Sequence, residues 1–439
     1  MQPTAKFPQI QLPRVLGFKI EDTATERPPH SSGNRQLTTM IGRIPFWLSA
    51  IEVLIVFVVF AAMAAVRPPD VNESHYLIKA KHFWNPEWCH NDLFLESTNA
   101  HYFFFLVAGW PTLFLSLDVY AWLGRIIVWL AASVAWVQLS RCLGIGRFIS
   151  PFSAALFVLL NSRFNMAGEW VIGGFEAKSV AYVLVLWSVI FFIRGRVDRF
   201  WPALGLACAF HPLVGIWALA CFLASQTVFG AVQRRATGAE TARVLFFFPA
   251  KPMIVFFLFL LAGCLPPLLA NLGESGEVIR LANQIQVHQR LAHHLLFGGF
   301  PTHCIARFAL VVIIWMALTQ LLPWDMAFQR MQWFGGGSLL ISLAGLLLSS
   351  LAESQTVVSP FADSLLRFYW FRFSDFAVPL CLALMVGKLA HSLIRSWQPA
   401  RRRVAIACGV VIAVAAGLHV EQIHRDPRAA ADAASLPSY

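Results

Sequence analysis

Long uninterrupted blocks of apolar residues constrain the fold of this chain more than any other feature. Ile44–Val66, Ile305–Leu322 and Val404–Val420 each approach the ~20 residues that a helix needs to cross ~30 Å of hydrocarbon. Only 13% of the 439 residues are charged, whereas soluble chains carry about 25%. Backbone polar groups in lipid must be paired within their own segment, and these blocks lack the alternation of barrel strands. The sequence therefore predicts an all-α, polytopic bundle of transmembrane helices.

The apolar blocks predict eleven crossings of the membrane. Residues 201–229 are too long for one span and are interrupted at His211-Pro212, so we expect two short helices that meet near the outer face. Tyr102–Leu117 is apolar but short, and we expect it to form an interfacial helix at the outer surface of the membrane. The other predicted spans are Ile44–Val66, Val119–Leu139, Phe148–Met166, Ser179–Ile193, Pro252–Ala270, Ile305–Leu322, Gly335–Leu351, Phe376–Ile394 and Val404–Val420.

The charge pattern predicts the domain organisation and the orientation. Residues 1–43 are polar and are expected to form a disordered cytoplasmic tail before the transmembrane domain, 44–420, and a short C-terminal tail, 421–439. Lys and Arg concentrate in the loops that an inside N-terminus places in the cytoplasm, as the positive-inside rule requires. These clusters are Arg194, Arg196 and Arg199; Arg234, Arg235 and Arg243; and Arg401–Arg403. A multi-pass protein of the cytoplasmic membrane is expected.

The net charge of +11 is better explained by anionic lipid than by nucleic acid, because the basic residues follow the cytoplasmic loops. Membrane lipid is therefore the expected partner, and no nucleic acid is expected. The external loops are 67–118, 161–178, 271–304 and 352–375, and they hold most of the histidines and most of the loop carboxylates. Polar chemistry gathered on one side of a helical bundle predicts a functional site on that side.

The first external loop carries the strongest candidate residues. Two prolines end the first span, and Asp70 and Glu73 follow, three residues apart and on one face of a helical turn. Two close carboxylates split their pKa values or share a divalent cation, and either arrangement suits a general base. The alternative is structural: Asp70 caps a short helix that has Glu73 in its first turn.

The start of this loop, Asp70-x-x-Glu73-x-x-Tyr76 directly after a long apolar helix, resembles the GT-C superfamily of membrane glycosyltransferases. The interfacial segment in the loop, the second polar loop and the pair of short helices after it are similar to the layout of that superfamily. The resemblance covers roughly residues 44–229. It implies a polyprenyl-phosphate-linked sugar as donor, transfer to an acceptor outside the cytoplasm, and Asp70 as catalytic base, with Glu73 as the second choice.

The second external loop has the composition of a sugar-binding loop. Gly173-Gly174 lets the backbone approach a ligand closely, and Trp170 offers an aromatic face. Glu169, Glu176 and Lys178 add charges that could hold hydroxyl groups or phosphate. The alternative is a turn that connects two helices, with a capping carboxylate and with Lys178 extending toward the membrane surface.

The third and fourth external loops supply cations. Arg290 and His294 are expected to share one face of a helix over 289–294, and with His293 they could hold a phosphate leaving group. Adjacent histidines on a helix point apart, so no metal site is predicted there. Arg367 and Arg372 lie where an external enzyme would bind an anionic lipid head group, although the surrounding aromatic residues also fit an interface belt.

Two further residues were selected from within or beside the spans. Arg125 lies seven residues after Asp118, and because a charge within the membrane must face protein or a cavity, Arg125 is a candidate ligand of the donor phosphate. His211 precedes Pro212 at the predicted break and would present its ring at the outer face. A transporter or flippase for a lipid-linked or polar substrate, and a non-catalytic membrane scaffold, are the alternative functions.

The predicted orientation can be tested with an impermeant thiol reagent on intact cells, in a variant without native cysteines. Cysteines introduced at Asn91 and Ser275 should react, because both positions lie in external loops, and one at Thr237 should not. Labelling at Thr237 alone would reverse the orientation.

Overall fold

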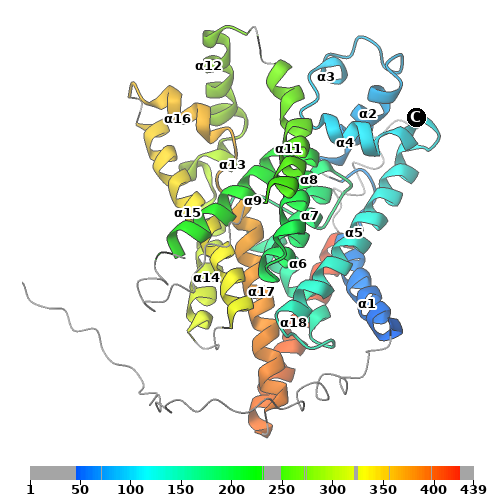
Figure 1. Ribbon diagram of the computed structural model, residues 1–439, viewed down its shortest axis with the longest axis vertical. Coiled ribbons are helices and arrows are strands. Elements are labelled where there is room, and N and C mark those ends of the chain that lie inside the picture. Colours follow the sequence, from blue (N-terminus) through cyan, green and yellow to red (C-terminus); the bar gives the residue numbers. More distant parts are fainter. Residues whose placement is uncertain are drawn as a thin grey trace, which may run out of the picture. The chain divides into compact units, whose positions relative to one another are not determined.

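The computed structural model describes residues 46–70, 72–229, 231, 249–270, 272, 274–320, 325–354, 356–396 and 398–425. Every regular element in these ranges is a helix, as Figure 1 shows, so the predicted all-α fold is confirmed. The predicted tail 1–43 and residues 426–439 lie outside the described residues. Residues 421–425, predicted to belong to the C-terminal tail, instead continue the last helix.

Seven described helices are long and apolar enough to cross a membrane. Each coincides with a predicted span, although several extend beyond the apolar block into amphipathic turns at one or both ends. The seven are α1 (Phe46–Ala64), α5 (Leu117–Cys142), α11 (Ala250–Ala270), α14 (Thr302–Thr319), α15 (Met326–Glu353), α17 (Arg372–Arg395) and α18 (Pro399–Arg425).

The four remaining predicted spans are also helical but shorter. They are α6 (Ser150–Arg163), α7 (Ala177–Ile193), α8 (Val197–Phe210) and α9 (Pro212–Ala224), which continues as a π-helical turn, η3 (Ser225–Phe229). The expected break at His211-Pro212 is present. Proline fits the first turn of α9 without losing a hydrogen bond, and the His211 ring accepts a bond from the Val214 N–H at 3.3 Å.

The short helices lie inside the bundle and several long ones surround them. Most side chains of α7 are buried, and it packs against α5 and α8, while α17 packs against α6 and α15. In contrast, only 11% of α11 and of α18 is buried, and their apolar side chains point outward. Outward-facing apolar helices around a packed centre are the arrangement expected of a bundle in lipid.

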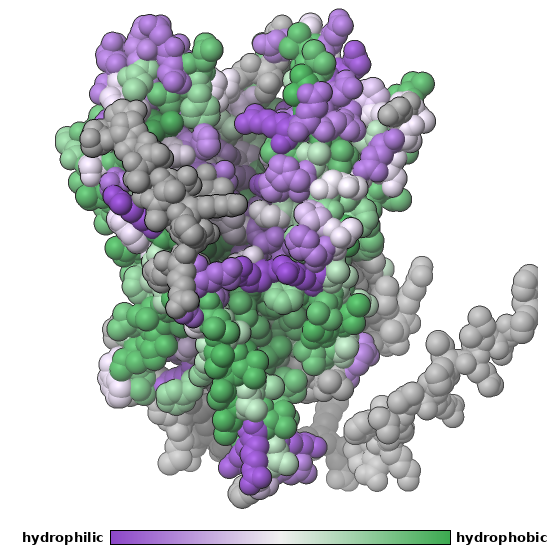
Figure 2. Space-filling model, turned by 180° about the vertical axis from the view of Figure 1, so that it is seen from behind, coloured by the Kyte–Doolittle hydropathy of each residue, from purple (hydrophilic) through white to green (hydrophobic). Residues whose placement is uncertain are grey.

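The loops between spans form small helices at one end of the bundle (Figure 1). The first loop folds into α2 (Glu73–Trp84), α3 (Leu93–Glu96), α4 (Tyr102–Ala108) and the short η2 (Trp110–Leu113). The third loop contains α12 (Gly276–Gln284), η4 (Ile285–Arg290), α13 (Ala292–Leu295) and η5 (Phe297–Gly299), and the fourth contains α16 (Ser359–Leu366). On the face drawn in Figure 2, hydrophilic residues gather in this half, where the surface is hollowed, and hydrophobic residues cover much of the other half.

Close approach of α8 and α11 depends on glycine. A Cβ added to Gly205 of α8 would lie 2.7 Å from the Cα of Phe256 in α11, closer than real Cβ atoms come. Small residues let membrane helices pack backbone against backbone, which replaces the hydrophobic driving force that lipid removes.

Gly205→Leu should therefore separate α8 from α11, and we expect overpacking to lower the free energy of unfolding by about 1–3 kcal/mol or more. Gly409→Leu is the matched control, since a Cβ at Gly409 of α18 meets nothing within 4 Å. Thermal unfolding of the purified protein in detergent measures both, and equal melting temperatures would contradict the packing argument.

Candidate functional site

A buried ion pair joins the first loop, which the sequence predicts to be external, to α5. Glu73 begins α2 and Arg125 lies in α5, and neither side chain is exposed. Arg125 Nε donates to Glu73 Oε1 at 2.8 Å, and Arg125 Nη2 donates to the other carboxylate oxygen. The remaining guanidinium nitrogen, Nη1, donates to the carbonyl oxygen of Val66, just beyond the end of α1. A two-pronged arginine–carboxylate pair is stronger and more directional than a single contact.

Glu73 also accepts two backbone hydrogen bonds, from Phe175 N–H at 2.6 Å and from Asp70 N–H at 2.9 Å. Its carboxylate oxygens are thus fully used in holding two loops, which is a structural role rather than that of a base. Arg125 is occupied in the same way, so the geometry does not support it as a phosphate ligand. Asp118, which shares its helix, is exposed at the start of α5.

Asp70 lies beside the two glycines of the second loop. A Cβ added to Gly173 would lie 3.2 Å from Asp70 Oδ2, and one added to Gly174 would lie 3.2 Å from Asp70 Cβ. Only glycine lets the two loops come this close. The structure also places the helix cap elsewhere than the alternative interpretation expected. The first turn of α2 follows Asn72, and the Glu73 side chain bonds back to the Asp70 N–H.

The second loop contributes a chain of paired charges. Lys178 Nζ lies 2.9 Å from Glu169 Oε1 and 3.8 Å from Glu176 Oε2, and all three side chains are buried. Arg372, at the start of α17, approaches the other Glu169 oxygen at 3.9 Å and remains partly exposed. The Lys178 ammonium also stands 3.8 Å over the ring of Trp170, a favourable cation–π contact.

Two buried residues that the sequence analysis did not select hold the second loop in place. The Asp375 carboxylate accepts backbone hydrogen bonds from Met166 and Ala167, both at 2.7 Å. The Asn161 side chain donates to the Glu169 carbonyl oxygen at 3.0 Å and accepts from the Val171 N–H at 3.0 Å. For Asp375 the sequence did offer a signal: a carboxylate directly before an apolar block needs hydrogen-bond partners inside the protein.

Aromatic and histidine rings form a wall beside these charges, which we call the aromatic wall: Tyr76, His101 and His211. The rings of His101 and His211 stack with centroids 4.5 Å apart, and Tyr76 lies 5.4 Å from His101. All three are half-buried. Burial, with Lys79 nearby, lowers the pKa of His101 to about 4, so its ring is neutral at physiological pH. The sequence analysis selected His211 but not Tyr76 or His101.

His294 reaches the same region from the third loop. Its Nδ1 lies 2.7 Å from the Ala167 carbonyl oxygen, and a Cβ on Gly168 would clash with its ring. Burial, followed by the charge of Arg372, lowers the pKa of His294 to about 4. The imidazole is therefore neutral and donates to the carbonyl group, which fixes its tautomer.

Two predicted cation ligands, Arg290 and Arg367, lie apart from this group, whereas the His293 ring lies 4.1 Å from that of His294. Arg290 and His293 are exposed. The helix expected over 289–294 is wrong, because η4 ends at Arg290 and α13 begins at Ala292, so Arg290 and His294 do not share a helix face. Arg367 donates to Asn283 Oδ1 at 2.8 Å and ties α12 to the end of α16.

The remaining residues converge from six separate parts of the chain, and we call them the polar cluster: Asp70, Glu73, Tyr76, His101, Arg125, Glu169, Glu176, Lys178, His211, His294 and Arg372. Burial raises the pKa of the Glu176 carboxyl to about 8; Lys178 opposes this shift and the neighbouring carboxylates of Glu169, Asp70 and Glu73 add to it. Glu176 is therefore largely protonated at neutral pH.

Within the described ranges, no three His, Cys, Asp or Glu residues are arranged to hold a metal ion.

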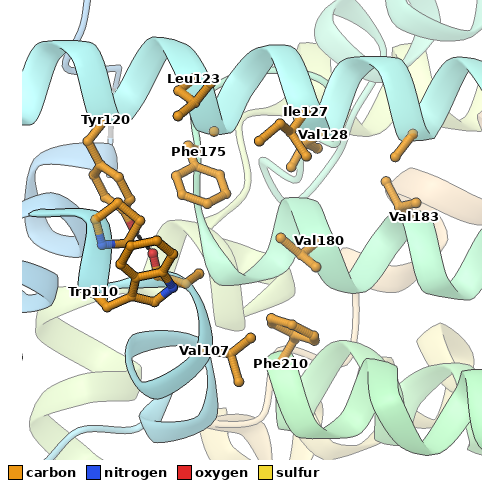
Figure 3. A pocket seen from close by; sticks show the side chains of 14 residues that line it. Val107, Trp110, Tyr120, Leu123, Ile127, Val128, Phe175, Val180, Val183 and Phe210 are labelled. Carbon is orange, nitrogen blue, oxygen red and sulfur yellow. Dashed lines mark hydrogen bonds between the residues drawn. The ribbon is translucent and has the colours of Figure 1, made fainter. Parts of the chain in front are cut away.

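An apolar cavity of about 300 Å³ lies next to the polar cluster. Figure 3 shows Leu123 and Ile127 of α5 on one side of it and Val180 and Val183 of α7 on the other, with Trp110 at one end. Phe175 and Phe210 also line this cavity, and the residues that follow them, Glu176 and His211, belong to the polar cluster. The apolar cavity and the polar cluster therefore adjoin each other at these two places in the chain.

Comparison of this chain with known protein families, with curated proteins and with solved structures gives no match. The chemistry of the site must therefore be inferred from its own residues.

Glu73→Gln should destabilise the protein strongly, because it leaves the buried Arg125 charge without its partner. We expect the loss of a buried pair to cost about 3–5 kcal/mol. Glu87→Gln, the same change at an exposed position of the same loop, is the control and should change stability by less than about 0.5 kcal/mol. Chemical denaturation in detergent micelles compares the two, and a Glu73 variant as stable as the Glu87 variant would disprove the structural role.

Proposed function

We propose that this protein is a membrane glycosyltransferase of the GT-C type, which transfers a sugar from a polyprenyl-phosphate donor to an acceptor outside the cytoplasm. The observation that carries the proposal is that the apolar cavity and the polar cluster adjoin each other at Phe175-Glu176 and Phe210-His211. A lipid-phosphate-linked sugar has two matching parts, an apolar chain and a polar head. A site for such a molecule needs an apolar surface that opens directly onto charges.

In this proposal all eleven predicted apolar segments cross the cytoplasmic membrane, with the N-terminus inside and the polar cluster outside. The short helices α6 to α9 are central spans that neighbouring helices bury, which tolerates shorter lengths than lipid exposure does. The exposed apolar side chains of Leu106 and Val107 in α4 and of Phe114 just after η2 support a position of these helices in the outer interface. The apolar cavity, which Val107 also lines, then faces the lipid from which the donor enters.

Asp70 is the proposed base. It removes the proton of the acceptor hydroxyl, whose oxygen forms a bond to the anomeric carbon while the bond from that carbon to the phosphate oxygen breaks. The electron pair of the broken bond leaves with the lipid phosphate. Asp70 suits this role better than Glu73, because Glu73 is fully buried and spends its oxygens on Arg125 and two backbone N–H groups. The two glycines of the second loop bring its backbone close to Asp70.

Lys178 and Arg372 are the proposed ligands of the donor phosphate. Both are cationic and belong to the polar cluster, and Arg372 is partly exposed, so a ligand can reach it. Fixed cations stabilise the charge that develops on a leaving phosphate in the transition state. Arg125 instead supports the site through its ion pair with Glu73, while Arg290 and Arg367 lie apart from it and His293 contacts it only through His294.

The purified protein in nanodiscs should bind a polyprenyl phosphate, and Arg372→Gln should weaken that binding by roughly ten- to a hundredfold. A charge-assisted contact contributes about 1.5–3 kcal/mol, and about 1.4 kcal/mol corresponds to a factor of ten. Ala131→Trp, which fills the apolar cavity from α5, should weaken binding as well.

Arg290→Gln is the control for this experiment, because that arginine is exposed and outside the polar cluster. If wild type binds no polyprenyl phosphate, the transferase proposal fails, and a transporter or flippase, or a scaffold, replaces it. If the Arg372 and Arg290 variants bind equally, the assigned phosphate site is wrong.

Asp70→Asn tests the base. Removing general-base help should slow sugar transfer by ~10²–10⁴, while polyprenyl-phosphate binding stays within about twofold of wild type. The assay incubates membranes with a radiolabelled polyprenyl-phosphate sugar and follows label in the acceptor fraction, with Glu96→Gln as a control in the same loop. Unchanged transfer by the Asp70 variant would remove Asp70 from the mechanism.

A further inference from the structure

Three buried polar atoms near the aromatic wall have no hydrogen-bond partner among the described residues: His101 Nδ1, Glu176 Oε1 and Arg372 Nε. The Glu176 side chain is only 1% exposed. A buried polar atom without a partner costs about 1–3 kcal/mol, so such atoms are rare unless a ligand or water completes them. They come from the first loop, the start of α7 and the start of α17, which are far apart in sequence.

The Tyr76 side chain lies near the three residues that carry these atoms. Its ring lies 5.4 Å from that of His101. Burial raises the pKa of the Tyr76 phenol well above its usual value; the nearby carboxylates of Glu176 and Glu169 raise it further, and the cation of Arg372 lowers it. His211 stacks on His101, and its pKa is lowered by burial, then by His101, Lys178 and Arg372. The unpartnered groups therefore surround one patch of aromatic surface.

The charges beside this patch are already compensated by one another. Lys178 pairs with Glu169 and Glu176, and Arg372 pairs with Glu169. The two histidine rings are neutral, since burial lowers the pKa of both. What remains for a ligand is a set of neutral or balanced donors and acceptors beside flat rings. A charge on the ring itself would have to break an existing pair or lie unpaired in a desolvated site, whereas the donor phosphate meets Arg372 where that side chain is exposed.

We propose that the aromatic wall, together with Glu176 and Arg372, binds an uncharged, hydroxyl-bearing ring and discriminates against rings that carry a carboxylate or an amine. This inference rests on the proposed transferase and specifies its sugar: a neutral hexose rather than a uronic acid or an amino sugar. The C–H faces of such a ring pack on Tyr76 and the histidines. Its hydroxyl groups donate to Glu176 Oε1 and accept from Arg372 Nε, and His101 Nδ1 bonds to a third hydroxyl group in either direction.

Selectivity follows from the surroundings of the aromatic wall. A uronate would bring a further negative charge toward the carboxylates of Glu169 and Asp70. An amino sugar would bring a positive charge toward Lys178 and Arg372. Like charges in a buried site are costly and act as a device for specificity. A neutral ring meets neither penalty.

Saturation-transfer NMR on the full chain in nanodiscs tests this inference with free ligands, so that no lipid donor is needed. Methyl glucoside, methyl galactoside and methyl mannoside are compared with glucuronate and glucosamine. At least one neutral glycoside should give signal, and both charged rings should bind roughly tenfold more weakly or not at all. His101→Ala should weaken the binding of the neutral glycoside by about three- to tenfold, because it removes one hydrogen bond and one stacking face.

His90→Ala, an exposed histidine of the same loop, is the matched control and should leave binding unchanged. Tyr76→Phe keeps the ring, removes only the hydroxyl group and should retain most of the binding, so it tests the wall if the His101 variant does not fold. Tyr76→Leu should lose binding.

Absence of signal from every neutral glycoside overturns the inference, as does equal binding of glucuronate or no difference between the His101 and His90 variants. If polyprenyl phosphate binds and no sugar does, this inference alone fails. If a neutral glycoside binds with the expected variant pattern and polyprenyl phosphate does not, the transferase proposal fails while the ring site stands.

Discussion

The buried pair of Glu73 and Arg125 is the interaction on which the rest of the site depends. Two charges in a low-dielectric interior are costly unless they are paired and every remaining hydrogen-bonding position is used. Here the guanidinium also holds the Val66 carbonyl group, and the carboxylate also holds the Phe175 and Asp70 N–H groups. One ion pair thereby fixes the end of α1, the first loop, α5 and the second loop relative to one another.

A second buried carboxylate has a comparable role on the far side of the second loop. Asp375 accepts backbone hydrogen bonds from Met166, Ala167 and Glu169. The Asn161 side chain bonds to the Glu169 carbonyl group and to the Val171 N–H. The second loop is therefore held at two points by groups that do not need to meet a ligand. This division leaves Glu176, Lys178 and Arg372 free to serve chemistry, because the backbone that carries them is already fixed. Precise positioning of this kind is what catalysis by pre-oriented groups requires.

The apolar cavity and the polar cluster indicate a particular kind of ligand only when they are considered together. An apolar cavity alone fits any lipid, and a cluster of paired charges alone fits a structural network. Because Phe175 and Phe210 line the apolar cavity while the next residues, Glu176 and His211, belong to the polar cluster, the two features adjoin each other, as the proposed amphipathic donor requires. The aromatic wall adds a flat surface for a ring at the polar end.

The sequence by itself determined the helical membrane architecture, the break at His211-Pro212 and the concentration of polar residues in a few loops, because these follow from composition and local backbone rules. It also selected most members of the polar cluster. Which side chains meet was decided only by tertiary packing. Arg125 is paired with a residue 52 positions away, and Asp375 binds a loop about 208 positions away. Nothing in the local sequence distinguishes His101 from other loop residues, and only the folded chain shows that its ring stacks on that of His211 at the break after α8. Local patterns specify helices and charges, but contacts between distant segments arise only when the whole bundle is assembled.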